Sequence, residues 1–189
     1  MSVAAAEDAL MRLTPRAARR GSTWFGRLGD VVQQPPVWAG VAALLAIASP
    51  RGRRAALRGG VCYGTAAVVA NLIVKPLVGR GRPPGAAAGR AGPITSSFPS
   101  GHAATDLAFA LGAAQELPLL FLPLSAFTLA AHWSLVRSRG HYPSDVLVGG
   151  ALGVLVAAGV WFLWPPRARD GDPERPSVTE PRQSRGAEG

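Results

Sequence analysis

The sequence of 189 residues has little cysteine, little lysine and few charged side chains of either sign. Its one cysteine, Cys62, excludes an internal disulfide and offers no metal site, and its place in an apolar run indicates a core residue. Charged residues make up 16% of the chain, where about a quarter is usual in soluble domains. No charged side chain occurs from residue 146 to 166, and no lysine or arginine from 91 to 136. These absences argue against a soluble domain.

The charges that are present favour a membrane surface over nucleic acid. Nineteen arginines and one lysine, Lys75, against 11 acidic residues give a net charge of +9. Proteins that bind nucleic acid display basic residues on a polar face. Here they flank apolar runs, which fits anionic lipid headgroups. We therefore expect membrane lipids as partners and no nucleic acid. The excess of arginine and alanine over lysine also suggests a GC-rich bacterial source.

Apolar runs along the chain predict an all-α protein, an integral membrane bundle of about five helices without strands. Some of these runs have the roughly 20 residues that a spanning helix needs, and the shorter ones need flanking residues or cover from neighbouring helices. Arg58, near the start of one run, is expected to snorkel outward. Small residues, frequent in the last run, allow close helix packing in lipid. The predicted helices are Pro36–Ser49, Ala55–Val74, Ala103–Gln115, Leu117–Val136 and Val146–Trp164.

The apolar region divides the chain into three parts. Residues 1–34 are basic and lack the continuous apolar stretch of a secretory signal, so we expect an interfacial helix there. Residues 35–166 form the predicted transmembrane domain. Residues 167–189 are rich in Pro, Arg, Glu, Ser and Gly without apolar periodicity, which predicts a disordered tail. The apolar contributors to the interfacial helix would be Leu10, Leu13, Trp24, Phe25 and Leu28.

Lys75 and Arg82 place two cations near the end of a predicted helix. Seven residues are nearly two helical turns, so both side chains return to one face, although Gly79 and Gly81 loosen the helix. An arginine fork and a lysine point charge can divide the oxygens of a phosphoryl group between them. The alternative is a lysine that snorkels to the membrane surface and a juxtamembrane arginine, without a shared ligand.

A second cluster, Ser100-Gly101-His102, precedes an apolar helix. Ser100 is a natural N-cap, Gly101 lets the backbone approach an anion closely, and free N–H groups at a helix start bind phosphate oxygens. His102 can protonate a leaving oxygen as a general acid. Asp106, one turn later, either orients His102 or forms a buried hydrogen bond between helices. The alternative for the cluster is a capped helix start with a chance histidine.

The third cluster opens the last apolar run with His141 and, four residues later, Asp145. A carboxylate at this spacing can hold the imidazole in one tautomer, with Nδ1–H toward Asp145 and Nε2 left as a nucleophile. The alternative is a structural hydrogen bond. Two predicted helices separate this loop from the loop that carries Arg82 and Ser100, so all three clusters should meet at one membrane face.

The membrane side of the site follows from the remaining basic residues. Cations at the site serve chemistry, and a helix lying on the surface need not obey the positive-inside rule. With those set aside, the arginines between residues 51 and 58 place the loop before the second predicted helix in the cytoplasm. We therefore expect a multi-pass protein of the cell membrane with its site on the extracytoplasmic face.

Taken together, the three clusters resemble the signature of the type 2 phosphatidic acid phosphatase family, lipid phosphatases that share a helical core with vanadium haloperoxidases. The resemblance covers about residues 24–164. The first motif, Lys-(six residues)-Arg-Pro, is met by Lys75, Arg82 and Pro83. The second, Pro-Ser-Gly-His, is met by residues 99–102.

The third motif, Ser-Arg-(five residues)-His-(three residues)-Asp, is met in part. Ser134, His141 and Asp145 fit, but Leu135 stands where the family has an arginine that acts as a third cation on the phosphate. Its absence should weaken transition-state stabilisation. Arg137 is a candidate replacement, as is Arg139.

The resemblance implies hydrolysis of a lipid phosphomonoester or diphosphate through a phosphohistidine on His141. His102 would protonate the departing oxygen and later activate water, and Asp145 would hold His141. The resemblance implies no cofactor and no metal, since cationic side chains take the metal's place. The implied phosphate-binding residues are Lys75, Arg82, Ser100, Gly101 and Arg137.

The family's substrates include phosphatidate, phosphatidylglycerol phosphate, polyprenyl diphosphates and polyprenyl sugar phosphates. Within the family, the chain looks like a short actinobacterial form that acts on polyprenyl-phosphoryl-phosphoribose in cell-wall synthesis. The alternative is a weakly active or non-catalytic membrane protein that binds a lipid phosphate. Leu135 favours that alternative, and the intact Lys75, His102, His141 and Asp145 oppose it.

Overall fold

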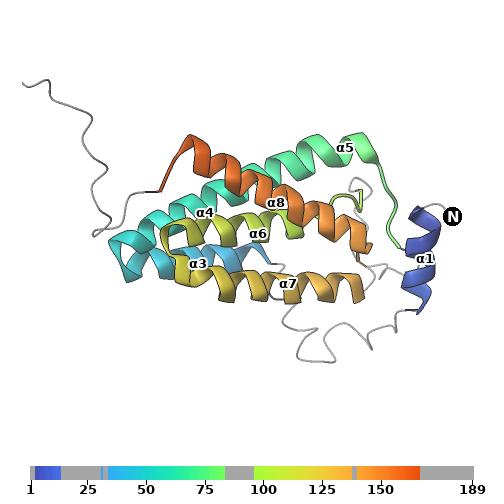
Figure 1. Ribbon diagram of the computed structural model, residues 1–189, viewed down its shortest axis with the longest axis horizontal. Helices are drawn as coiled ribbons and strands as arrows, with labels where there is room; N and C mark the ends of the chain where they lie inside the picture. Colours follow the sequence, from blue (N-terminus) through green and yellow to red (C-terminus); the bar gives the residue numbers. More distant parts are fainter. Residues whose placement is uncertain (1–2, 14–30, 32–33, 84–95, 138–139, 167–189) are drawn as a thin grey trace, which may run out of the picture.

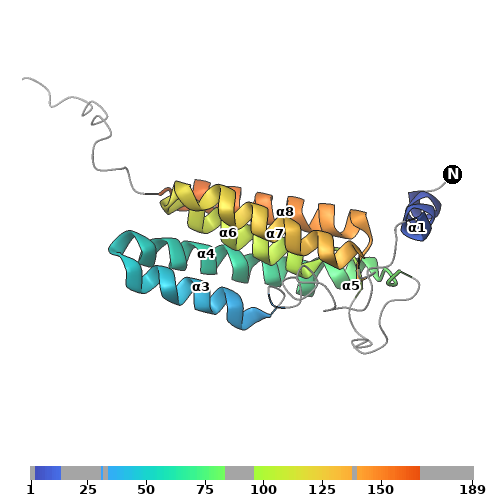
Figure 2. The same cartoon turned by 90° about the horizontal axis from the view of Figure 1, so that it is seen from below.

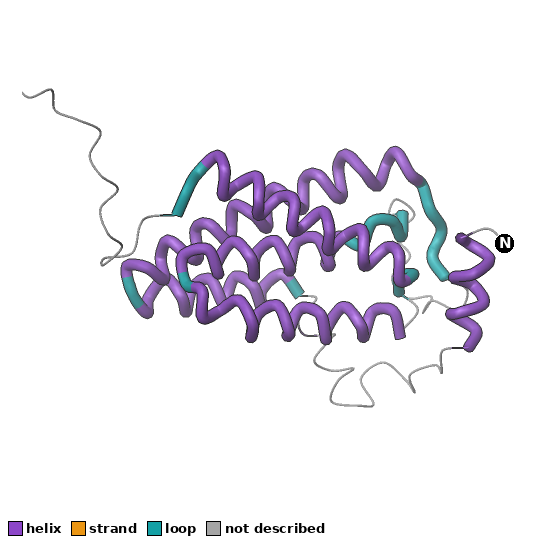
Figure 3. The backbone as a smooth tube through the Cα atoms, in the orientation of Figure 1, coloured by secondary structure: helices purple, strands orange, loops and turns teal. Residues whose placement is uncertain are grey.

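The structure is a computed structural model that describes residues 3–13, 31, 34–83, 96–137 and 140–166. Among these residues every regular element is a helix and none is a strand, as the sequence predicts (Figure 3). In chain order they are α1 (Val3–Leu13), α3 (Pro35–Ala48), α4 (Pro50–Val68), the π-helical segment η1 (Val69–Val74), α5 (Lys75–Val78), α6 (Gly101–Glu116), the short 3₁₀ helix η2 (Pro118–Leu120), α7 (Phe121–Arg137) and α8 (Pro143–Leu163).

Helix α6 lies at the centre of the bundle. It packs against α4, α7 and α8, and α3 packs on α4. Figures 1 and 2 show these helices running side by side, with α1 apart from them across one end. The expected tail at 167–189, and Trp24, Phe25 and Leu28 of the expected interfacial helix, lie outside the described residues.

Small residues let the central helices approach one another. The side chains that α6 buries are mostly alanines. A Cβ on Gly153 of α8 would lie 2.6 Å from the carbonyl oxygen of Ala104, and one on Gly149 would lie 2.4 Å from that of Ser100. A larger residue at either glycine would push α8 away from α6, so the close packing depends on their lack of a side chain.

Large apolar side chains cover the outside of the bundle. In water such a surface would promote aggregation, whereas in a bilayer it contacts acyl chains. Two helical stretches among the described residues, Pro50–Val78 and Pro143–Leu163, are long and apolar enough to cross a membrane, and Pro36–Ala48 and Pro118–Ser134 are shorter apolar helices. The most exposed of the apolar residues include Leu77, Leu119, Leu122, Phe162 and Leu163.

Arg58 does not snorkel outward, so that expectation was wrong. It is fully buried beside the last residues of α6, with Nε 3.1 Å from Glu116 Oε1 and Nη1 3.1 Å from Gln115 Oε1. That end of α6 lies opposite α1 in the bundle (Figure 1). It also donates to the carbonyl oxygen of Trp164 and lies 4.4 Å from the centre of that ring. Because Glu116 supplies a counter-charge inside the bundle, Arg58 can join α4, α6 and the residue that follows α8.

Removing one partner of this ion pair should destabilise the protein more than removing both. Glu116→Leu would leave Arg58 buried without its counter-charge, and we expect the free energy of unfolding to fall by about 3–5 kcal/mol. Combining it with Arg58→Met replaces the pair by apolar side chains and should recover most of the loss. Denaturant unfolding of the purified protein in detergent, followed by circular dichroism, measures both. A double variant no more stable than Glu116→Leu would contradict this account.

Candidate active site

Segments far apart in the sequence meet at one end of the bundle. The backbone N–H of Ser100 donates to the carbonyl oxygen of Asp145 at 2.8 Å, which joins the start of α6 to the start of α8. Arg82 donates from Nη1 to the carbonyl oxygen of Gly140 at 2.8 Å, beside His141. The three sequence clusters therefore lie at the same end, the one across which α1 lies (Figure 1).

Lys75 and Arg82 reach this end by a different route from the one their spacing suggested. The helix ends at Val78, because Gly79 has a φ of 61°, the left-handed conformation that closes a helix. Arg82 therefore lies on the loop that follows the helix, and the expected shared helical face was wrong. The two cations still lie close enough for the charge of Arg82 to act on Lys75.

Lys75 stands beside the start of α6. Its Nζ lies 2.6 Å from Oδ1 of Asn71 in the π-helical segment η1. A Cβ on Gly101 would lie 2.8 Å from Asn71 Oδ1 and 3.2 Å from Lys75 Nζ, so a side chain there would displace the Asn71 amide that holds the ammonium group. Ser100 caps α6 as expected, its Oγ accepting from the N–H of Ala103 at 3.3 Å. An ammonium group beside a helix N-terminus attracts phosphate.

Asp106 forms a hydrogen bond between two helices. Its Oδ2 lies 3.2 Å from Nε2 of His132 in α7, and its Oδ1 accepts from Thr105 Oγ1 at 3.2 Å. Asp106 and His132 are both almost fully buried. Of the two alternatives that the sequence left open, the buried bond between helices is therefore the one that the structure shows. His102, in the first turn of α6, stays partly exposed.

The expected hydrogen bond from Nδ1 of His141 to Asp145 was wrong, because a backbone carbonyl takes that position. Nδ1 of His141 lies 2.8 Å from the carbonyl oxygen of Ser97 and 3.7 Å from Asp145 Oδ2, which is beyond hydrogen-bond length. A carbonyl oxygen can only accept, so we assign Nδ1 of His141 as the donor, and in the neutral ring this tautomer leaves the lone pair on Nε2. Asp145 Oδ2 accepts instead from the backbone N–H of Tyr142 at 2.9 Å.

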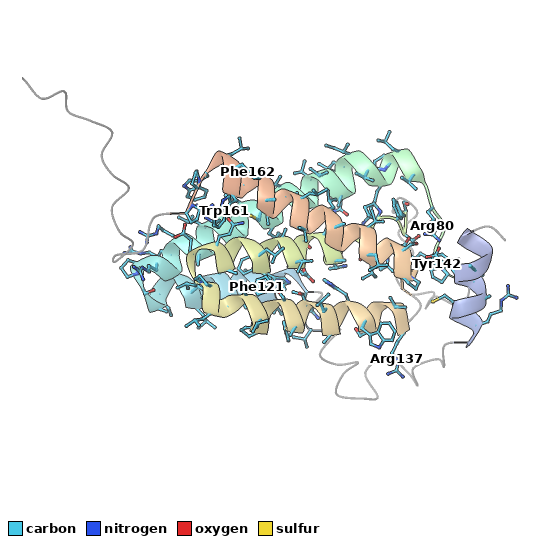
Figure 4. All side chains as sticks on the ribbon, in the orientation of Figure 1. Arg80, Phe121, Arg137, Tyr142, Trp161 and Phe162 are labelled. Carbon is cyan, nitrogen blue, oxygen red and sulfur yellow. The ribbon has the colours of Figure 1, made fainter. Side chains whose placement is uncertain are left out.

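Arg80 was not singled out from the sequence, yet it forms an ion pair with Asp145. Its Nη1 lies 2.9 Å from Asp145 Oδ1 and 2.8 Å from Ser144 Oγ. Its guanidinium carbon lies 4.1 Å from the centre of the Tyr142 ring. Figure 4 shows Arg80 and Tyr142 together beside α1. The only signal in the sequence was a third cation two residues before Arg82, outside any motif.

Helix α1 contacts this end of the bundle through acidic residues. Glu7 Oε2 lies 2.5 Å from Arg80 Nη2, and Glu7 Oε1 accepts from the backbone N–H of Ser144 at 3.1 Å. The hydroxyl of Tyr142 donates to Asp8 Oδ1 at 3.0 Å. The sequence had drawn attention to basic and apolar residues of this region. The contacts use carboxylates because Arg80 and the N-terminus of α8 both offer positive charge.

Burial and charge act in opposite directions on the ionisation of this contact. Burial alone would raise the pKa of the Glu7 carboxyl, but hydrogen bonds from Ser144 and Arg80 outweigh it, so that pKa is lower than usual. Burial would likewise lower the pKa of Arg80, yet the hydrogen bond to Glu7 and the charge of Asp145 raise it above its usual range. The pair is therefore present at neutral pH, and the stability it contributes is lost as the pH falls through the lowered pKa of Glu7.

Arg137 lies on the last turn of α7, where its side chain is exposed. Figure 4 shows this side chain directed away from Arg80 and Tyr142. Leu135 lies on the same helix, two residues earlier. Within the described part of the chain, no group of three or more His, Cys, Asp or Glu side chains is arranged to hold a metal.

Comparisons with known proteins identify the family to which the chain belongs. The chain matches the PAP2 superfamily over residues 55–169. It is 42% identical over 125 residues to the decaprenylphosphoryl-5-phosphoribose phosphatase of Mycobacterium tuberculosis, in strains CDC 1551 and H37Rv, and the match covers 64% of this chain and 68% of that protein. The fold is similar to that of a transmembrane PAP2-type phosphatidylglycerolphosphate phosphatase from Bacillus subtilis, with a TM-score of 0.63, 21% identity and 85% of each chain covered. The resemblance found in the three clusters is confirmed: the chain belongs to the PAP2 superfamily and is a phosphatase.

Proposed function

We propose that this phosphatase releases phosphate from a membrane lipid without a metal, through a phosphohistidine on His141. The observation that carries the proposal is the place of His141, whose Nδ1 is tied to the Ser97 carbonyl at 2.8 Å and whose Nε2 is left to attack. Lys75 and the N-terminus of α6 lie at the same end of the bundle and supply the positive potential that a phosphate needs.

The proposed reaction has two steps. In the first, His141 Nε2 attacks phosphorus, and a P–N bond forms as the bond to the leaving oxygen breaks. His102 gives a proton to that oxygen, so the remainder of the lipid departs as a neutral alcohol. In the second, a water molecule attacks phosphorus and gives a proton to His102. The P–N bond then breaks, which releases inorganic phosphate and restores His141.

In the proposed mechanism, several hydrogen-bond donors bind the phosphoryl oxygens. Lys75 and Arg82 provide cationic donors, and the free N–H of Gly101 belongs to the first turn of α6. The Oγ of Ser100 accepts the capping bond from Ala103, so its own proton stays available for a phosphate oxygen. Together these groups would disperse the charge that develops on phosphorus.

The proposed substrate is a polyprenyl lipid that ends in a phosphorylated ribose. The M. tuberculosis relatives are named for such a lipid, and the match to them covers 64% of this chain. We propose further that residues 35–166 cross the cell membrane as five helices and that the site faces away from the cytoplasm. The exposed apolar side chains and the arginines at 51–54 support this placement.

A second candidate function is lipid-phosphate binding with weak or absent turnover. The observation that favours it is Leu135, an apolar residue where the family's third motif has a cation. With fewer cations around the phosphate, the site would stabilise the transition state less than a site with the third cation would. The lipid could then bind with little or no turnover.

Replacing the proposed nucleophile should abolish turnover. We expect His141→Ala to lower kcat by about 10⁴-fold or more, since no other group can form the P–N bond. Phosphate release from a panel of lipid phosphates by purified protein in detergent, with and without EDTA, measures this. Orthovanadate should inhibit the wild type competitively, and EDTA should have no effect. Equal phosphate release by the wild type and a folded His141→Ala protein would rule out the phosphohistidine.

Two further variants test the third motif. Because the side chain of Arg137 is directed away from Arg80 and Tyr142, we expect Arg137→Ala to be nearly silent. Leu135→Arg should raise kcat, by up to about 10²-fold, the scale of one transition-state donor. The same phosphate-release assay measures both. The opposite pattern, a large loss in Arg137→Ala and no gain in Leu135→Arg, would show that Arg137 supplies the missing cation.

Cysteine labelling tests the side of the membrane. In a Cys62→Ala background, Gly89→Cys should react with an impermeant maleimide in intact cells, because in the sequence it lies between Arg82 and Ser100, which belong to the proposed site. Arg53→Cys, exposed at the start of α4, should react only after lysis. The reversed pattern would place the site in the cytoplasm.

A further inference from the structure

The N-terminal helix is connected to the site by a single guanidinium group. Arg80 binds Glu7 of α1 through Nη2 at 2.5 Å and Asp145 of α8 through Nη1 at 2.9 Å. Asp145 is fully buried, and Glu7 is 9% exposed. The three side chains therefore form one ionic cluster, with the arginine between two carboxylates.

The net charge of this cluster affects how strongly Asp145 can stabilise a positive charge on the His141 ring. Asp145 and Arg80 alone would form a neutral pair, and the imidazole would gain little from a carboxylate already neutralised. With Glu7 added, two negative charges and one positive charge leave a net charge of −1 beside His141. A net negative charge stabilises an imidazole ring that becomes positive, as it does when Nε2 attacks phosphorus.

We propose that Glu7 is a positioning residue for the phosphatase reaction: by pairing with Arg80 it leaves the negative charge of Asp145 to act on His141. This inference rests on the proposed function, in which His141 is the nucleophile. It adds to the site a residue from outside the segment that matches the family, residues 55–169. Glu7 touches neither substrate nor His141 in this account, and it acts through Arg80.

Several other groups lie near His141 and also affect the stability of its charged form. Asp145 lies on the same element, 3.7 Å from Nδ1, and the Ser97 carbonyl lies on the segment before α6. The charge of His102, on α6, couples to His141, and Arg82 binds the carbonyl of the preceding residue. Among these groups, only Asp145 has its charge shared with Arg80 by a direct contact in the described structure.

Removing the charge of Glu7 tests the inference. Glu7→Gln keeps the shape of the side chain and changes the cluster from −1 to neutral. The imidazolium form of His141 then loses support, so the acidic limb of the kcat/KM profile should move to lower pH. We expect kcat to fall about ten- to a hundredfold, the range seen when an outer-shell partner of a functional histidine is removed, with KM little changed.

The double variant separates charge from structure. Arg80→Gln alone makes the cluster −2, so it should move the acidic limb to higher pH. Glu7→Gln combined with Arg80→Gln returns the cluster to −1, so the limb should return toward the wild-type position and kcat should recover in part. A purely structural docking role predicts instead a double variant no better than the worse single variant, with the limb unmoved. Either an unmoved limb in Glu7→Gln or a double variant without recovery overturns the inference.

Asp8→Asn is the matched control. It removes the same charge from the adjacent residue of α1 and weakens the contact to Tyr142, but it does not touch Arg80. Its pH profile should stay close to that of the wild type, and a shift as large as that of Glu7→Gln would overturn the inference.

A measurement without turnover separates this inference from the proposed function. In detergent, an NMR titration of the histidine signals, with the His141 signal identified by its loss in His141→Ala, follows the ring directly. The same order of midpoints, Glu7→Gln below wild type and double variant near wild type, supports the role of Glu7 even if no lipid phosphate is hydrolysed. Identical midpoints in all variants overturn it, whether or not phosphate is released.

Discussion

The contact between α8 and α6 is the one on which the whole site depends. Gly149 brings the first turns of α8 against the carbonyl of Ser100, and the N–H of Ser100 in turn binds the carbonyl of Asp145 at 2.8 Å. In lipid no hydrophobic drive presses helices together, so such close backbone contact has to supply the attraction. The same contact sets the turn that carries His102 against the turn that carries His141. A side chain at Gly149 would therefore disturb chemistry as well as packing.

Each end of the bundle holds an arginine that binds carboxylates, and the two serve different purposes. Arg58 is fully buried, and its partner Glu116 belongs to no proposed catalytic group, so the pair only fastens helices together. At the other end Arg80 binds Asp145, a residue of the third motif, as well as Glu7. A cation removed from water needs a counter-charge wherever it lies. At the site end, Arg80 has two such counter-charges, Glu7 of the N-terminal helix and Asp145 of the proposed reaction, and it connects them.

The residues that the sequence identified are those whose side chains are proposed to carry the chemistry themselves. Lys75, Ser100, His102, His141 and Asp145 stand in short motifs, and their residue types alone suggest phosphate binding and proton transfer. The all-helical fold could also be predicted, because a long apolar run in lipid must satisfy its backbone hydrogen bonds internally, as a helix does. The N-cap at Ser100 followed from a local rule and formed as expected.

The rest depended on contacts between residues far apart in the chain. The carbonyl of Ser97, 44 residues before His141, has no side-chain signature by which a sequence could mark it. Arg58 was misjudged because its partner Glu116 lies 58 residues away. The end of the helix after Lys75 was misplaced because the effect of Gly79 depends on its positive φ, which the sequence permits without requiring.

Glu7 is the case in which sequence and family together say least. It lies 73 residues before Arg80 and outside the matched segment 55–169, in a region where arginines outnumber acidic residues. Only the folded chain shows that its carboxylate meets both Arg80 and the N-terminus of α8. A motif defines which groups touch the phosphate, but the charge those groups present is set by their neighbours. In this chain, the N-terminal helix is one of the neighbours, because it contacts Arg80, which binds Asp145 of the third motif.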